Sequence, residues 1–209
     1  MRSYAKVFGI AIPRGFKIND SWGRSAETLC KRIQQHLRQP ITGQFEAAMV
    51  QPCKSADLRY SVWLIAYSQV GVEEHGGPNR GKEVEAYLAS TGLGGGYPWC
   101  AAFTTWCLKN AGWTGSLPTY SAYVPSWEAW GQTKGYVIPY TKARMGDFVT
   151  YQFDSDAESD HIGIVTRKTA STIYAIEGNT SNSNWADGDG VFERVREKKY
   201  VAKIIRVAY

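Results

Sequence analysis

The sequence is poor in the residue types that define several specialised classes of protein. Its 209 residues include only four cysteines and three histidines. Four cysteines in a chain of this length do not form a disulfide framework, and no Cys/His spacing suggests a zinc site. No stretch approaches the ~20 consecutive apolar residues that a membrane-spanning helix needs. These absences exclude a small disulfide-stapled scaffold and a membrane-spanning protein, whereas 44% hydrophobic and 21% charged residues are ordinary globular values.

The N-terminus also lacks a recognisable secretory signal. Residues 7–12 form an apolar run that ends at Pro13, and the apolar core of a signal peptide is longer than this. We therefore expect a protein that is made in the cytoplasm without a cleavable signal.

The net charge of +5 is unevenly distributed along the chain. Residues 1–55 contain nine basic and three acidic residues, whereas residues 56–209 contain 15 basic and 16 acidic residues. This division predicts a basic, mostly helical extension (1–55) and a nearly neutral main domain (56–209). A basic extension is attracted to anionic surfaces such as a cell wall by long-range, salt-sensitive forces.

The extension contains one clear helical pattern. Leu29, Ile33 and Leu37 recur at four-residue spacing within residues 25–38, and Pro40 follows them. With its Thr-Gly-Gln-Phe turn, the segment 29–50 faintly resembles the small three-helix peptidoglycan-binding repeats, but the match is short, and a basic helical extension packed on the main domain is favoured over it. Cys30 and Cys53 are either paired in an oxidising compartment or both free.

The main domain changes its pattern about halfway along. Helices are expected at 56–70, 83–88, 98–110 and 126–130. Strands rich in β-branched residues are expected at 147–153, 161–167, 172–177, 191–196 and 201–207. Helices followed by strands predict an α+β fold with an antiparallel sheet.

Cys100 is the strongest candidate for chemistry. It follows a Gly-rich loop at the start of the helix expected at 98–110. A helix N-terminus presents unpaired N–H groups and the positive end of the helix dipole, which favour a thiolate and can stabilise an oxyanion. The alternative is a structural cysteine, which is how we interpret Cys107.

A thiolate nucleophile needs a base that can also protonate the leaving group. His161 is the best placed of the three histidines, because it begins an apolar strand directly after the acidic turn 154–160. Glu177 and Asn179 end the next strand, and either could accept the imidazole N–H.

Taken together, these residues resemble a CHAP domain, from the papain-like superfamily of cysteine hydrolases that includes NlpC/P60. The matching motifs are Val70-Gly71-Val72-Glu73-Glu74, Pro98-Trp99-Cys100-Ala101-Ala102-Phe103, Arg144-Met145-Gly146-Asp147-Phe148-Val149, Asp160-His161-Ile162-Gly163-Ile164-Val165 and Glu177-Gly178-Asn179. The resemblance implies a papain-like fold and hydrolysis of an amide bond of peptidoglycan, either between muramic acid and L-Ala or within the stem peptide or cross-bridge.

The resemblance also implies residue roles. Cys100 would attack the carbonyl, His161 would act as general base and acid, Glu177 would orient His161, and Asn179 would assist at the same edge. The backbone N–H of Cys100 and a group from residues 97–99 would stabilise the oxyanion.

Substrate contacts are expected from aromatic residues. Tyr97 and Trp99 adjoin the nucleophile, Trp185 is a third candidate, and Tyr120 and Tyr123 could also line the groove. No cofactor or metal is expected. Some phage CHAP domains carry an Asp-rich calcium loop before the cysteine, but residues 91–99 contain no carboxylate. The acidic turns at 154–160 and 187–189 are interpreted as solvated.

The expected function is therefore that of a cysteine amidase or endopeptidase, either a phage lysin or a secreted antibacterial effector, acting in the periplasm or outside the cell. Its expected partner is peptidoglycan, together with an immunity or inhibitor protein in the effector setting, and we expect a monomer with no nucleic-acid partner. Two alternatives remain: a wall-binding module with a vestigial site, and a cysteine hydrolase of another amide.

Overall fold

The computed structural model describes residues 1–8, 10–13, 23–156, 158–181 and 188–207. Within these ranges the helices are α1 (Arg2–Phe8), α2 (Arg24–His36), α3 (Ala47–Ser68), α4 (Lys82–Ala89), α5 (Cys100–Asn110) and α6 (Val124–Thr133). The strands are β1 (Val137–Ile138), β2 (Phe148–Tyr151), β3 (His161–Lys168), β4 (Thr172–Thr180), β5 (Gly190–Glu197) and β6 (Val201–Ile205). No described helix has the length and apolarity that crossing a membrane requires.

The six strands form one sheet in the order β1-β6-β2-β3-β4-β5, and all neighbours are antiparallel. The prediction of an α+β fold with an antiparallel sheet is confirmed. Side chains alternate between the two faces of a strand, so that on β2 Phe148 packs with the helices and Val149 packs in a second cluster.

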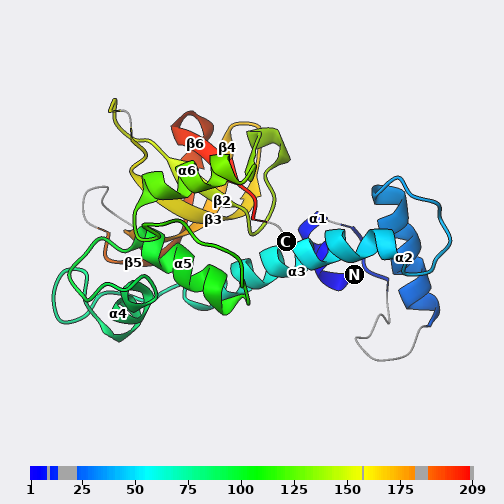
Figure 1. The fold of residues 1–209 in the computed structure, drawn as a ribbon, viewed down its shortest axis with the longest axis horizontal. Helices are drawn as coiled ribbons and strands as arrows, with labels where there is room; N and C mark the ends of the chain where they lie inside the picture. Colours follow the sequence, from blue (N-terminus) through cyan, green and yellow to red (C-terminus); the bar gives the residue numbers. More distant parts are fainter. Residues whose placement is uncertain (9, 14–22, 157, 182–187, 208–209) are drawn as a thin grey trace.

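The main core lies between the sheet and helices α3 to α6. Helix α5 packs on β3 and β4, and Figure 1 shows it running beside the sheet. Its apolar residues Ala101, Ala102 and Phe103 are completely buried. This packing brings the first turn of α5 close to the start of β3 and the end of β4, where the candidate catalytic residues lie.

Helix α3 connects the two parts of the molecule, with α1 and α2 around its first half and the sheet beside its second (Figure 1). The domain boundary expected after residue 55 therefore falls inside a helix. The expected boundary rests on the change in charge along the chain, which does not show where a helix begins, and Pro52 lies within α3. A proline there removes one backbone hydrogen bond, and burial of Met49 in the small N-terminal core and of Val62 in the main core offsets that cost.

The N-terminal core is small but specific. It contains Leu29, Cys30, Ile33, Met49 and Cys53 together with residues of α1. Cys30 and Cys53 are both free and buried. The buried amide of Gln34 holds the turn that follows α2, because it donates to the Gln44 carbonyl and accepts from the Gly43 N–H.

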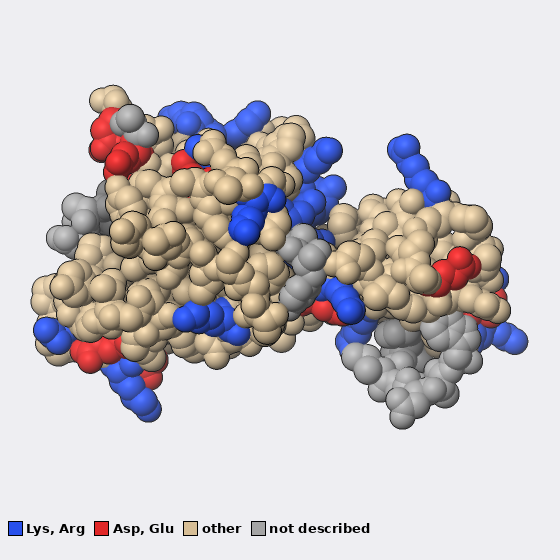
Figure 2. Space-filling model, in the orientation of Figure 1, with Lys and Arg blue, Asp and Glu red and all other residues tan. Residues whose placement is uncertain are grey.

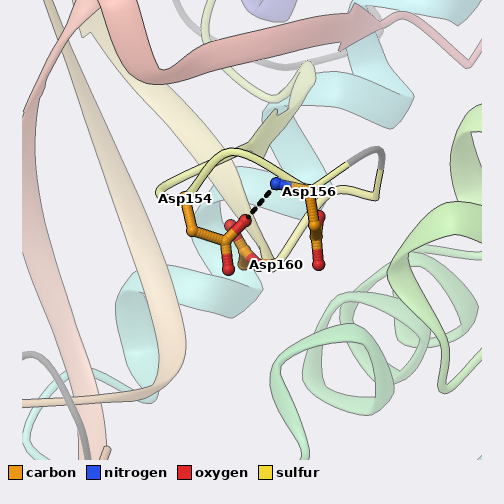
Figure 3. A group of neighbouring side chains, drawn as sticks. All are labelled: Asp154, Asp156 and Asp160. Atoms are coloured by element: carbon orange, nitrogen blue, oxygen red, sulfur yellow. Dashed lines mark hydrogen bonds between the residues drawn. The ribbon is translucent and has the colours of Figure 1, made fainter.

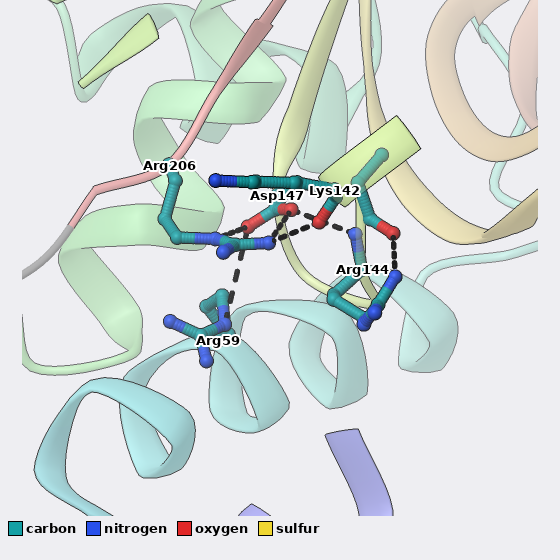
Figure 4. Close-up of polar contacts among 6 residues, drawn as sticks. Arg59, Lys142, Arg144, Asp147 and Arg206 are labelled. Atoms are coloured by element: carbon teal, nitrogen blue, oxygen red, sulfur yellow. Dashed lines mark hydrogen bonds and ion pairs between the residues drawn. The ribbon is translucent and has the colours of Figure 1, made fainter. Parts of the chain in front are cut away.

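A buried ionic cluster attaches α3 to the sheet. Arg206 makes a bidentate contact with the completely buried Asp147, and Arg59 of α3 lies 3.9 Å from the same carboxylate (Figure 4). Gly146 has φ +77°, and a Cβ there would lie 2.0 Å from the Arg59 carbonyl oxygen. The Gly146-Asp147 motif therefore fixes the position of α3. Phe8 of α1 packs under the Arg59 guanidinium at 5.7 Å.

Lys and Arg side chains are scattered over both parts of the face seen in Figure 2 and form no continuous patch there. On this face, the basic residues of segment 1–55 are therefore spread out and do not form one positively charged patch.

Candidate active site

Cys100 is the first residue of α5 and is only 7% exposed. Its position depends on Trp99, whose carbonyl oxygen accepts the Phe103 N–H at 2.8 Å and begins the helix. The Trp99 indole is completely buried and donates to Glu74 Oε1 at 2.8 Å. The expectation that Trp99 contacts substrate is therefore corrected: its side chain is a buried anchor for the start of α5, next to Cys100.

His161 begins β3 and lies close enough to Cys100 for the thiol to influence the pKa of the imidazole. Its ring is held flat against Tyr151 of β2, with the ring centroids 6.2 Å apart and an interplanar angle of 24°. Its Nε2 lies 3.1 Å from Glu177 Oε2, although the ring N–H is not well aligned on that oxygen. The helix and two strands thus bring a thiol, an imidazole and a carboxylate together.

Glu177 is completely buried on β4 and is clamped from β5 by Arg196. Arg196 Nε donates to Oε1 at 3.2 Å and Nη2 donates to Oε2 at 2.7 Å. The close approach of Glu177 to β3 depends on Gly163, because a Cβ at that position would lie 2.8 Å from Glu177 Cγ.

Arg196 was missed in the sequence analysis. It stands opposite Ile173 in the ladder, whereas Glu177 stands opposite Phe192. The guanidinium therefore reaches along β4 to meet Glu177. β5 also contains Arg194 and two glutamates, and nothing in the sequence marks which of these charges is buried.

The electrostatics of the site favour the imidazolium form of His161. Burial alone would lower the pKa of His161, but hydrogen bonds to Cys100 and Glu177 and the negative charges of both groups outweigh burial and raise that pKa to about 10. For Glu177, burial would raise the pKa, but His161 and Arg196 reverse the effect and lower it. The carboxylate is therefore held ionised beside the imidazolium.

Asn179 lies close to these residues but makes a different contact from the one expected. It adopts a left-handed backbone conformation (φ 54°) at an irregularity in the β4–β5 ladder. Its Oδ1 accepts the Trp99 backbone N–H at 3.3 Å. Asn179 therefore stabilises the start of α5. Its Oδ1 also binds the Trp99 N–H, which belongs to the loop (97–99) that was expected to help stabilise the oxyanion.

Of the other two residues predicted to contact substrate, Tyr97 and Trp185, only Tyr97 lies in the described part of the chain. Tyr97 is exposed and lines a groove next to Pro98, whereas Trp185 lies outside the described residues. A second hollow, on the other side of Pro98, is lined by Glu74, Asn79 and Asn179 among others.

The acidic turn after β2 gathers three exposed carboxylates, from Asp154, Asp156 and Asp160, whose oxygens lie within 4.8 Å of one another (Figure 3). The Asp156 N–H donates to Asp154 Oδ1 at 3.0 Å, and Asp160 accepts the Phe153 N–H. These carboxylates thus serve the backbone of their own loop.

The sheet, the helix carrying a cysteine at its N-terminus, and the histidine on the neighbouring strand define a papain-like α+β fold. Residues 92–179 match the model of the CHAP domain family, and this match confirms the resemblance found in the sequence. The matched segment includes Cys100, His161, Glu177 and Asn179 and ends before Arg196.

Solved structures give a broader comparison. The P60 domain of an antigen from M. avium paratuberculosis is 18% identical with a TM-score of 0.45, over 74% of this chain and 96% of that one. The peptidoglycan hydrolase RipB from Mycobacterium tuberculosis is 14% identical with a TM-score of 0.43, over 95% of each chain. The comparison with curated proteins gives no match.

Proposed function

We propose that this protein is a cysteine hydrolase that cleaves an amide bond of bacterial peptidoglycan, within the stem peptide, within the cross-bridge or at the bond to muramic acid. The observation that carries the proposal is the buried series of contacts from Cys100 through His161 and Glu177 to Arg196, at the N-terminus of α5. A vestigial wall-binding site has no need to retain a buried imidazole, carboxylate and guanidinium in contact, because burying charges is costly.

The proposed reaction has two halves. The Cys100 thiolate attacks the amide carbonyl, the oxyanion forms near the Cys100 N–H at the helix end, and His161 gives its proton to the leaving amine. A thioester remains on Cys100. His161 then takes a proton from water, which attacks the thioester, and the carboxylic acid is released while the Cys100 thiolate and the His161 imidazolium are restored. Glu177 stabilises the imidazolium in both halves.

The CHAP match and the motifs of the sequence support a bacterial wall as the substrate. Within this proposal the protein works as a phage lysin or as a secreted antibacterial effector, and it meets its substrate in the periplasm or outside the cell.

Digestion of purified sacculi tests the proposal. Directly cross-linked and bridge-containing sacculi are incubated with the protein, and the soluble fragments are identified by mass spectrometry. We expect fragments whose new ends are one amine and one carboxyl group, and these ends identify the bond. Fragments with new reducing sugar ends, or no release from either type of sacculus, would contradict the proposal.

The pH dependence gives a separate prediction. His161 is charged below its raised pKa and loses its proton as pH rises through that value, so kcat/KM is expected to fall on the alkaline side. Replacing Glu177 with Gln removes a negative charge next to the ring and should move this alkaline limb to lower pH. Glu193→Gln, at an exposed position on β5, is the control and should leave the profile unchanged. An alkaline limb at the same pH in Glu177→Gln would refute the assigned role of Glu177.

A further inference from the structure

An open groove of about 490 Å³ is lined at one end by Tyr97 and Pro98, which precede Cys100 closely in the chain. Tyr97, Tyr120 and Tyr123 line it, and their side chains are 54%, 71% and 48% exposed. Only four tyrosines of the described part of the chain are exposed, and three of them meet here. We call this surface the tyrosine groove. Large exposed apolar groups gathered in one place point to a binding surface.

The groove is built on a braced loop. The Ser121 carbonyl accepts two hydrogen bonds, from Thr105 Oγ1 of α5 at 2.8 Å and from Trp127 Nε1 of α6 at 3.0 Å. The Tyr123 N–H donates to the Tyr120 carbonyl at 2.9 Å within the same loop. The exposed rings are therefore carried on a surface that is formed before any ligand arrives, which lowers the entropic cost of binding.

The tyrosine groove is lined by neutral residues, and the hydroxyl of Tyr123 donates to the carboxylate of Glu158, which lies outside the lining. None of its lining residues is charged, and Thr91, Thr119 and Ser121 add hydroxyl groups to the three rings. The hollow on the other side of Pro98 differs, because it contains the carboxylates of Glu74 and Asp189. A ligand for the tyrosine groove should therefore be uncharged, have an apolar face and carry hydroxyl or amide groups.

The peptidoglycan sugars meet this description better than the peptide does. N-acetylated hexoses have C–H faces that stack on the negative face of an aromatic ring, and they carry hydroxyl and amide groups around their edges. The stem peptide carries ammonium groups, which can pair with the carboxylates of Glu74 and Asp189 in the polar hollow. We propose that the tyrosine groove binds an N-acetylated sugar of the glycan strand while the peptide occupies the other side of Pro98. This inference rests on the proposed function.

Kinetics with two soluble substrates test the proposal. One is a disaccharide-peptide released from the wall, and the other is the same peptide without sugar. The quantity compared is the preference for sugar, which is kcat/KM for the disaccharide-peptide divided by kcat/KM for the free peptide. Tyr120→Ala removes one stacking ring and is expected to lower this ratio about tenfold. Tyr120→Phe keeps the ring and should retain most of the ratio. Tyr67→Ala, an exposed tyrosine on α3, should not change the ratio. An equal ratio in wild type and Tyr120→Ala would overturn the proposal.

A binding measurement separates this proposal from the proposed function. The N-acetylglucosamine trimer, which contains no amide bond of a peptide, is titrated into wild type and Tyr120→Ala and followed by calorimetry. Saturable binding that weakens about tenfold in Tyr120→Ala supports the sugar site. If neither peptide substrate is hydrolysed while the trimer binds in this way, only the proposed function is rejected. Trimer binding that is absent or equal in the two proteins would overturn the sugar site, whatever the activity.

Discussion

Replacing His161 with alanine is expected to lower kcat for release of wall fragments by about 10³- to 10⁴-fold. The loss combines two effects, because in the proposed reaction the imidazolium stabilises the Cys100 thiolate and also gives the leaving amine its proton. His161 is the only histidine in the described structure that contacts both Cys100 and a buried carboxylate.

His36→Ala is the matched control for this prediction. His36 lies in α2, in the other part of the molecule, where its ring packs on Phe8. The control should retain full activity, and the melting temperature of both variants reports whether they are folded. A folded His161→Ala protein with more than a tenth of the wild-type rate would contradict the assigned role.

The second large effect is expected at Arg196. Replacing it with Met leaves the Glu177 carboxylate buried without its bidentate partner, and breaking a buried ion pair from one side costs about 3–5 kcal/mol. In a chain of this size that loss corresponds to a fall in melting temperature of roughly 6–20 °C. Activity should fall as well, because Glu177 is then no longer held ionised and in place beside His161.

Two further variants distinguish positioning from general stability. The double variant Arg196→Met with Glu177→Leu replaces the pair with apolar groups and should recover most of the stability while remaining poorly active. Arg196→Lys keeps the charge but loses the fork geometry, so an intermediate activity is expected. An Arg196→Met protein with unchanged melting temperature and kcat would refute this assignment.

The sequence was sufficient to predict the general architecture. The change from helical to β-branched patterns predicted the antiparallel sheet, and the four-residue spacing of Leu29 and Ile33 predicted α2. The Gly-rich loop before Pro98 located the start of α5. These features depend on local periodicity and on chain-breaking residues, which are visible in one dimension.

What the sequence did not reveal depends on tertiary contacts. The change in charge after residue 55 does not show that a helix is continuous there, because packing on both sides of Pro52 stabilises α3. Trp99 could not be recognised as an anchor without knowing that Glu74 accepts its indole N–H. Asn179 leaves the expected face of β4 because the ladder is irregular there, and Arg196 reaches Glu177 along the strand rather than directly across.

The central claim is that Cys100 is the nucleophile of a wall hydrolase, and one comparison tests it most directly. Sacculi are incubated with equal amounts of wild type, Cys100→Ala and Cys107→Ala, and the rate of fragment release is measured. Cys107 is completely buried in the same helix and serves as the matched cysteine control. The account predicts release by wild type and Cys107→Ala and none above background by Cys100→Ala. Equal release by wild type and Cys100→Ala would contradict it.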